Sequence, residues 1–156
     1  MLIHDFDVFR WVMGDEAATL HATGSVLTDP KVGEAGDLDS TIVNIRTRSG
    51  KLCQINTTRR AAYGYDQRFE VLGSQGLLAC GNHKPTEVVA WGPNGISQDK
   101  PEAFFLQRYR DAYRLELEHF FARLQDGGKF RTTIADGVAR SEEHTSELQS
   151  RLHLVC

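Results

Sequence analysis

Apolar residues near the start of the chain recur at helical spacing. Phe6, Phe9 and Met13 stand three and four positions apart, and Gly14 follows directly. Side chains three or four positions apart share one face of an α-helix, and glycine is common just past a helix end. The pattern therefore predicts a short amphipathic helix over residues 5–13, with Gly14 as its C-terminal cap.

A strand-rich region follows this first helix. Short runs of β-branched and apolar residues alternate with turn residues, which is the pattern of paired β-strands. Ser49-Gly50 and Ser74-Gln75 each stand between two such runs and are predicted hairpin turns. The runs are residues 17–27, 40–48, 51–62, 68–73, 76–81 and 86–91, and the polar stretch at 28–39 is a predicted loop. Together they predict an antiparallel meander of about five or six strands.

The pattern changes after residue 101, where no Gly or Pro interrupts the chain until Gly127. Apolar side chains then recur every three or four positions, which predicts one long helix that lies across the sheet. The stripe consists of Phe105, Tyr109, Tyr113, Leu117, Phe120 and Leu124. "TTIAD" at 132–136 resembles a capping box, so a further helix is predicted to begin near Thr133.

Strands followed by helices in one short chain predict an α+β fold. We expect an open, mostly antiparallel sheet with helices on one of its faces. The length of 156 residues fits one domain that buries a real core. Residues 1–139 are assigned to this domain, and residues 140–156 to a separate tail.

Composition and charge exclude several classes of function. Hydrophobic residues make up 40% and charged residues 25%, as in ordinary globular proteins. The net charge of −3 and the absence of a Lys/Arg cluster argue against binding to nucleic acid or a membrane surface. No apolar run approaches the roughly 20 residues that span a bilayer. The N-terminus lacks the basic and long apolar stretches of a signal peptide, and the three cysteines are scattered and form no disulfide framework, so a reducing cytoplasm is the expected location.

No metal, disulfide or nucleotide motif is recognisable. Cys53, Cys80 and Cys156 form neither a CxxC pair nor a disulfide framework. No His/Cys/Asp cluster has metal-ligand spacing, and no GxGxxG or P-loop is present. His21 and His83 are isolated and are interpreted as structural or surface residues.

Three segments together resemble a known family: "IHDFDVFRWVMG", "NTTRRAAYGYDQRFEVLGSQG" and "FFLQRYRDAYRLELEHF". They are similar to the inositol 2-dehydrogenases of the glucose-fructose oxidoreductase-like (Gfo/Idh/MocA) family of NAD(P)-dependent sugar and polyol dehydrogenases. The resemblance covers residues 1–139 and corresponds to the C-terminal, substrate-side domain, so the Rossmann domain is expected to be missing. It implies a parent enzyme that oxidises a ring hydroxyl of myo-inositol to a ketone with NAD. The chain alone is then expected to be inactive.

The resemblance gives the first helix a catalytic role. The histidine of the family's D-x-x-x-H motif matches His4, and its aspartate would precede Met1, which we therefore interpret as an internal methionine. Histidine suits a general base because its ordinary pKa of about 6.5 lies near working pH. The resemblance implies that Asp7, three residues further on, binds substrate hydroxyls. The alternative is an exposed histidine at a helix start without a role.

Two tyrosines complete the candidate site. Tyr63 matches the family's Y-x-Y-D-Q-R segment and is a candidate substrate-binding residue, because a phenol both donates and accepts hydrogen bonds. The alternative is an aromatic side chain packed at a strand end. Tyr109 is a candidate cofactor contact, with a core position as its alternative. Asp66 and Arg68 are predicted to form a pair that shapes the loop.

Alternatives to this function and its assembly stay open. One is another NAD(P)-dependent sugar or polyol dehydrogenase of the family, because ring hydroxyls differ only in orientation. Another is a non-catalytic α+β binding or dimerisation module. The family also implies a homodimer or homotetramer formed through the open face of the sheet. In "IVNI" and "GLLAC", apolar residues fall on both faces of the predicted strand. An exposed apolar sheet face is unusual for a monomer.

The last residues do not continue the apolar stripe that is expected of the last helix. "RSEEHTSELQSRLHLVC" at 140–156 resembles the codon-by-codon translation of a short-read sequencing adapter, and the alternative is a native amphipathic helix. We expect the gene sequence to end near Ala139 and its native last helix to be missing. The tail, with His144, His153 and Cys156, is expected to carry no function and to make few contacts. A local helix around 142–148 would be marginal.

Overall fold

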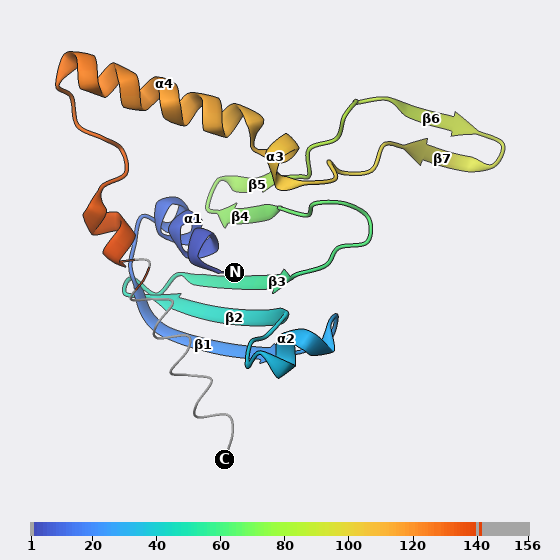
Figure 1. Cartoon of the computed structure of the whole chain (residues 1–156), viewed down its shortest axis with the longest axis horizontal. Coiled ribbons are helices and arrows are strands. Elements are labelled where there is room, and N and C mark those ends of the chain that lie inside the picture. The colour runs from blue at the N-terminus through green and yellow to red at the C-terminus, as the bar shows by residue number, and fades with distance from the viewer. Residues whose placement is uncertain (1, 140, 142–156) are drawn as a thin grey trace. The chain divides into compact units, whose positions relative to one another are not determined.

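The computed structural model in Figure 1 describes residues 2–139 and Ser141. Its contacts divide the chain into two units, Met1–Arg60 with Arg131–Cys156, and Ala61–Phe130. The first unit contains α1 (Ile3–Met13), β1 (Ala17–Ser25), α2 (Pro30–Glu34), β2 (Ser40–Thr47) and β3 (Leu52–Thr58). The second contains β4 (Phe69–Gly73), β5 (Gly76–Cys80), β6 (Val89–Gly92), β7 (Gly95–Gln98), α3 (Phe105–Arg108) and α4 (Arg110–Asp126).

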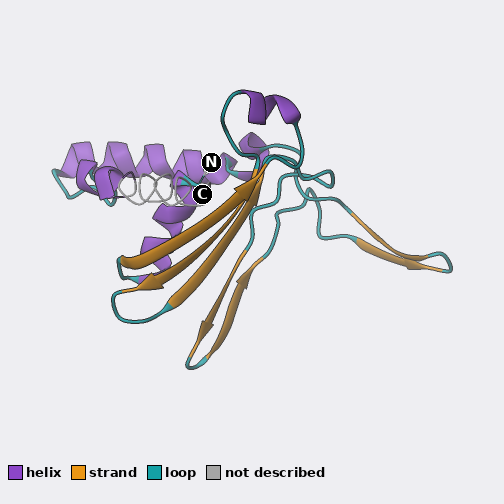
Figure 2. Ribbon diagram, turned by 90° about the horizontal axis from the view of Figure 1, so that it is seen from below, coloured by secondary structure: helices purple, strands orange, loops and turns teal. Residues whose placement is uncertain are grey.

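The first unit is built on a three-stranded antiparallel sheet in the order β1-β2-β3. Its strands twist together, as Figure 2 shows. Ile45 lies opposite both Leu20 of β1 and Cys53 of β3, which sets the register. At the β2–β3 turn the Gly50 N–H donates to Thr47 O over 3.0 Å, so the predicted turn at Ser49-Gly50 is confirmed.

Helix α1 covers one face of this sheet and forms the core with it. Every second side chain of β2 is buried and the side chains between them are exposed or partly exposed, the alternation of a strand with one covered face. Phe6 and Val43 are completely buried. The core consists of Leu2, Phe6, Phe9, Ala22, Val43 and Ile45. The opposite, open face is more polar, since it carries the Gln54–Asn44 side-chain hydrogen bond of 3.2 Å beside Ile42.

The predicted first helix is confirmed, and it ends as its sequence indicates. Gly14 has φ +56°, and its N–H donates to Arg10 O over 2.9 Å. Only glycine adopts this left-handed conformation at little cost, so it closes the helix. Beyond the cap, Arg10 forms an ion pair with Glu16 over 2.7 Å, which fixes the start of β1 beside the helix.

The stretch at 28–39 contains a helix that the polar pattern did not indicate. Asp29 caps α2 by accepting the Lys31 N–H over 3.0 Å. Asp39 is fully buried and accepts the backbone N–H groups of residues 27, 28 and 29 over 2.8 to 2.9 Å. Burial opposes ionisation of this carboxyl, but the three N–H donors outweigh burial, and the pKa of Asp39 is lowered.

The α+β class with open antiparallel sheets is confirmed, but the single meander is wrong. Among the described residues, the strands divide into one three-stranded and two two-stranded sheets, β4-β5 and β6-β7. The stretches at 59–68 and 81–88 lie between strands and are too long for tight hairpin turns. Strand β7 was not predicted, whereas the turn at Ser74-Gln75 is confirmed by the pairing of Gly73 with Gly76.

The predicted long helix is present with one interruption. It leaves regular helical geometry at Tyr109 (φ −107°, ψ 12°), where the ring packs edge-on against Tyr65 at 5.8 Å between centroids. None of the residues of α4 is buried, and Leu117 is 57% exposed. Its packing across a sheet stays a prediction.

The predicted capping box is confirmed. Residues 134–139 are helical, the Thr133 backbone N–H donates to Asp136 Oδ2 over 2.8 Å, and the Asp136 N–H donates to Thr133 Oγ1 over 3.4 Å. The predictions for the tail concern Arg140 and residues 142–156, which lie outside the described residues. Within the described part, no helix is both long and apolar enough to cross a membrane.

Candidate functional site

The candidate general base stands on the outer side of α1. His4 is the second residue of this helix and is exposed, and Asp7, three residues later, is half-buried. At about 100° per residue, both point away from the face that carries Phe6 and Phe9. The core therefore holds the helix while His4 and Asp7 face outward.

The far end of α1 is tied to the β2–β3 turn. Asp15 accepts the Ser49 backbone N–H over 3.0 Å and also the Ser49 hydroxyl, and Lys51 Nζ donates to Met13 O. The Ser49 hydroxyl is the main reason why the pKa of Asp15 is lowered. The Arg10 guanidinium likewise lowers the pKa of Glu16. These contacts anchor the C-terminal end of the helix that bears His4 to the sheet.

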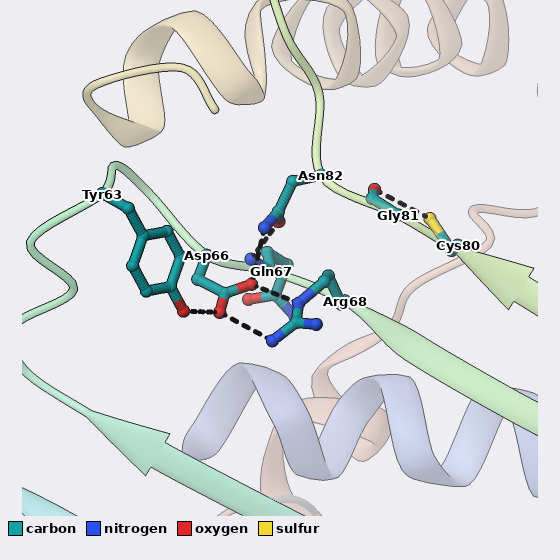
Figure 3. A network of polar contacts seen from close by, with 7 residues as sticks. All are labelled: Tyr63, Asp66, Gln67, Arg68, Cys80, Gly81 and Asn82. Atoms are coloured by element: carbon teal, nitrogen blue, oxygen red, sulfur yellow. Dashed lines mark hydrogen bonds and ion pairs between the residues drawn. The ribbon is translucent and has the colours of Figure 1, made fainter. Parts of the chain in front are cut away.

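The second group of candidate residues surrounds Asp66 in the other unit. The Tyr63 hydroxyl donates to Asp66 Oδ2, and Arg68 binds the same carboxylate through Nε at 2.7 Å and Nη2 at 3.0 Å. Asn82 Nδ2 donates to Asp66 Oδ1 over 2.7 Å. Figure 3 shows Tyr63, Asp66 and Arg68 on one stretch of chain, with Asn82 approaching from the stretch after β5. The predicted Asp66–Arg68 pair is therefore confirmed.

The charges in this group set its protonation states. The Arg68 guanidinium, followed by the Tyr63 hydroxyl and the Asn82 amide, lowers the pKa of Asp66 to about 2. The pKa of the Tyr63 phenol is raised, because its hydroxyl donates a hydrogen bond to the Asp66 carboxylate. Asp66 is therefore an anion and Tyr63 a neutral phenol over the working range of most enzymes.

Strand pairing brings these residues together. Phe69 lies opposite Cys80 at the open end of the β4–β5 hairpin, so the chain before β4 meets the chain after β5. Gly64 has φ +135°, and a Cβ there would lie 2.7 Å from Pro101 O, so only glycine allows this close approach. Sequence reasoning missed Asn82, although the hairpin register was a signal that could have placed it opposite the Asp66 segment.

The candidate cofactor residue has a packed ring. Tyr109 stacks edge-on with Tyr65 and Tyr113, and the Arg108 guanidinium lies 5.4 Å from its centroid. These contacts fit a packing role, and contact with a cofactor stays a prediction. The described residues contain no parallel strands, and the sequence has no Gly-rich turn to cradle a dinucleotide pyrophosphate. These residues do not by themselves fit NAD.

The structure thus presents the candidate residues as two groups. His4 and Asp7 belong to the first unit, and Tyr63 and Tyr109 to the second. The first group can accept a proton and hydrogen-bond a ligand, and the second can hydrogen-bond a hydroxyl. In the described residues, no group of three or more His, Cys, Asp or Glu side chains could hold a metal ion.

Comparison with curated proteins identifies similar sequences. The chain is 46% identical over 137 residues to myo-inositol 2-dehydrogenase of Thermotoga maritima and 42% identical over 139 residues to inositol 2-dehydrogenase of Rhizobium meliloti. These alignments cover 88% and 89% of the chain, but only 41% and 42% of the relatives. The scyllo-inositol 2-dehydrogenase (NAD(+)) of Bacillus subtilis is 32% identical, with 90% of the chain and 41% of the relative covered.

Solved structures show the same fold. A myo-inositol dehydrogenase from Corynebacterium glutamicum superposes with a TM-score of 0.90 at 36% identity, covering 96% of this chain and 45% of that one. A probable dehydrogenase from Thermotoga maritima gives a TM-score of 0.86 at 43% identity, covering 90% and 42%. The chain therefore spans about two fifths of the length of the proteins that it matches.

The family comparison agrees with these similarities. The family model described as GFO/IDH/MocA C-terminal domain matches residues 1–79, just over half of the chain. This stretch contains α1 with His4 and Asp7, the whole β1–β3 sheet, and Tyr63. The chain belongs to the GFO/IDH/MocA C-terminal domain family.

Proposed function

We propose that this chain is the substrate-side part of an NAD-dependent inositol 2-dehydrogenase, which oxidises a ring hydroxyl of myo-inositol to a ketone in the cytoplasm. The observation that carries the proposal is the position of His4, exposed beside Asp7 on the outer face of a helix anchored in the core. Relatives at 42% and 46% identity that are named as inositol 2-dehydrogenases support the substrate class.

The residue types suit the oxidation of a secondary alcohol. This reaction removes a hydride from carbon and a proton from oxygen, and NAD, when bound, accepts the hydride. His4 takes the proton as the general base. Asp7 and Tyr63 bind hydroxyls of the ring that do not react, and so orient the reacting carbon. Each of these groups acts through a hydrogen bond that a polyol can make.

The cofactor is bound mainly by residues outside these 156. The sequence holds no Gly-rich strand–turn–helix motif, which dinucleotide binding requires in this type of enzyme. Tyr109 is the one residue of this chain that we assign as a candidate NAD contact. The NAD-linked name of the Bacillus subtilis relative supports NAD as the oxidant.

The enzyme assembles as a homodimer or homotetramer through the open face of the β1–β3 sheet. On that face Leu52 is 75% and Ile42 49% exposed, and these apolar side chains stand among polar ones. Such a mixed surface is typical of an interface between subunits. Sedimentation of the active enzyme as a monomer at micromolar concentration would contradict this assembly.

The nearest alternative keeps the reaction and changes the substrate. Relatives named for myo-inositol and for scyllo-inositol both match this chain, so the hydroxyl orientation that it accepts is the point to test. A non-catalytic binding module is the alternative in another class.

The test uses an enzyme in which this chain replaces the matching region of the Thermotoga maritima relative, here called the two-domain enzyme. NADH formation at 340 nm is followed with myo-inositol, scyllo-inositol and a panel of sugars. Oxidation of myo-inositol supports the proposal, and preference for another polyol selects the alternative substrate. A folded two-domain enzyme that binds NAD but oxidises no polyol would reject the proposed function.

A further inference from the structure

The hydroxyl proton of Tyr63 already forms a hydrogen bond within the protein. Tyr63 donates it to Asp66 Oδ2, while the residue remains 48% exposed. A phenol has one proton, so the lone pairs of its oxygen are all that is left for a ligand. In this arrangement Tyr63 accepts a hydrogen bond from a ligand and offers none.

Asp66 itself has no acceptor site left for a ligand. Its Oδ1 accepts from Arg68 Nε and Asn82 Nδ2, both at 2.7 Å. Its Oδ2 accepts from Arg68 Nη2 at 3.0 Å and from the Tyr63 hydroxyl. An ionised carboxylate offers about four acceptor sites, and these four donors fill them. Asp66 can therefore influence a ligand only through Tyr63.

The partners of Asp66 are held in place in turn. Asn82 Oδ1 accepts the Gln67 backbone N–H over 2.8 Å, which decides which way the amide points and directs its NH₂ group to Asp66. The two Arg68 bonds form a fork that matches the plane of the carboxylate. The side chain of Asp66 is only 19% exposed, whereas that of Arg68 is 62% exposed. The carboxylate is thus enclosed and the phenol is presented at the surface.

We propose that Asp66 is a positioning residue: held by Arg68 and Asn82, it fixes the Tyr63 hydroxyl as a hydrogen-bond acceptor for a donor hydroxyl of the polyol. This inference rests on the proposed function, because it requires a polyol at Tyr63. A hydroxyl can donate to this acceptor, whereas a carbonyl oxygen at the same ring position could only accept. The arrangement therefore selects a hydroxyl over a carbonyl at this position.

The first experiment tests the contact in the 156-residue chain, independently of catalysis. The phenol resonance of Tyr63 is titrated by NMR in the unmodified chain and in Asp66→Asn, with Tyr63→Phe to assign the signal among the four tyrosines. The pKa of Tyr63 is expected to fall in Asp66→Asn, because an anionic acceptor no longer stabilises the protonated phenol. Should Asp66→Asn not fold, the carboxyl of Asp66 is titrated in Tyr63→Phe, where its pKa is expected to rise.

The second experiment measures the coupling in the two-domain enzyme. Asp66→Asn and Tyr63→Phe are each expected to raise KM for myo-inositol by up to about tenfold, the value of one hydrogen bond, and to change kcat little. The double variant should be no worse than Tyr63→Phe alone, because Asp66 acts through that hydroxyl. Glu118→Gln is the matched control, since it removes a carboxylate paired with Arg114 at 2.6 Å and should change neither KM nor the Tyr63 titration.

The outcomes separate this inference from the proposed function. A lowered Tyr63 pKa together with non-additive KM effects supports the positioning role. An unchanged titration, or additive KM losses, overturns it. An altered titration with unchanged KM in both single variants also overturns it, while the proposed function stands if the unmodified enzyme oxidises myo-inositol.

Discussion

His4 is the single residue on which the proposed chemistry depends most. In the two-domain enzyme, His4→Ala is expected to lower kcat by about 10²–10⁴-fold, the usual contribution of a general base. Asp7→Ala should act mainly on KM, because its proposed role is to bind hydroxyls of the substrate. Steady-state kinetics with myo-inositol measure both effects. Lys31→Ala is the control, since Lys31 is exposed on α2 and has no proposed role in the site or the assembly.

A loss of less than about threefold in kcat for His4→Ala would show that His4 is not the general base, because removal of a general base lowers kcat far more. An unchanged KM in Asp7→Ala would count equally against the role of Asp7.

Asp39 controls how the stability of the first unit depends on pH. Its pKa in the folded chain lies below the unfolded value of about 3.9, because three backbone N–H groups outweigh the cost of burial. Its stabilising contribution is therefore fully present above about pH 4 and is lost as the pH falls toward the folded pKa. The thermal midpoint of the unmodified chain should thus fall more steeply between neutral pH and acid than that of Asp39→Asn.

The variant should also be less stable at neutral pH, since an amide oxygen is a weaker acceptor for three N–H donors. If the thermal midpoints of the two proteins fall equally as the pH is lowered, Asp39 is not the group whose protonation lowers the stability.

At the scale of elements, the buried face of α1 supplies its packing against the sheet. Phe6→Ala is expected to lower the free energy of unfolding by about 3–5 kcal/mol, because it removes a fully buried ring and leaves a cavity under the helix. Trp11 lies on the same helix but is 79% exposed, so Trp11→Ala should change stability by less than about 0.5 kcal/mol. Urea unfolding followed by circular dichroism compares the two variants. Equal losses would contradict the assignment of the core.

Elements whose signals lie within a few residues could be predicted from the sequence. Gly14 closes α1, Ser49-Gly50 turns the β2–β3 hairpin, and Thr133 with Asp136 starts the last described helix. Each depends on a local hydrogen bond or on one backbone conformation. Helix α2 was missed because Asp39, ten residues beyond its cap at Asp29, organises that stretch.

The division of the strands into three sheets could not be predicted for a similar reason. It depends on where residues 59–68 and 81–88 lead the chain, which no local pattern encodes. In the candidate site, His4, Asp7 and Tyr63 came from the family resemblance. Asn82 was missed because its partner Asp66 lies 16 residues away across a hairpin.

At the scale of the whole molecule, the chain alone should neither bind NAD nor turn over. The residues that it contains lack a pyrophosphate cradle, and the described part has no parallel sheet on which one is built. Calorimetric titration of NAD into the purified chain is expected to show no binding, and the two-domain enzyme serves as the positive control. Micromolar affinity of the chain alone would contradict this prediction.

The two small sheets of the second unit also affect how the protein behaves in concentrated solution. Among the residues that the structure describes, each of the strands β4 to β7 has one neighbour in its sheet, so each leaves a row of backbone groups without a partner strand. Natural proteins usually blunt such edges with lysine or proline, but Glu70 is the sole charged residue in these four strands. Leu72, Leu78 and Trp91 are more than 70% exposed beside these edges. Edge-to-edge aggregation, rather than unfolding, is therefore expected to limit the concentration at which this chain stays in solution.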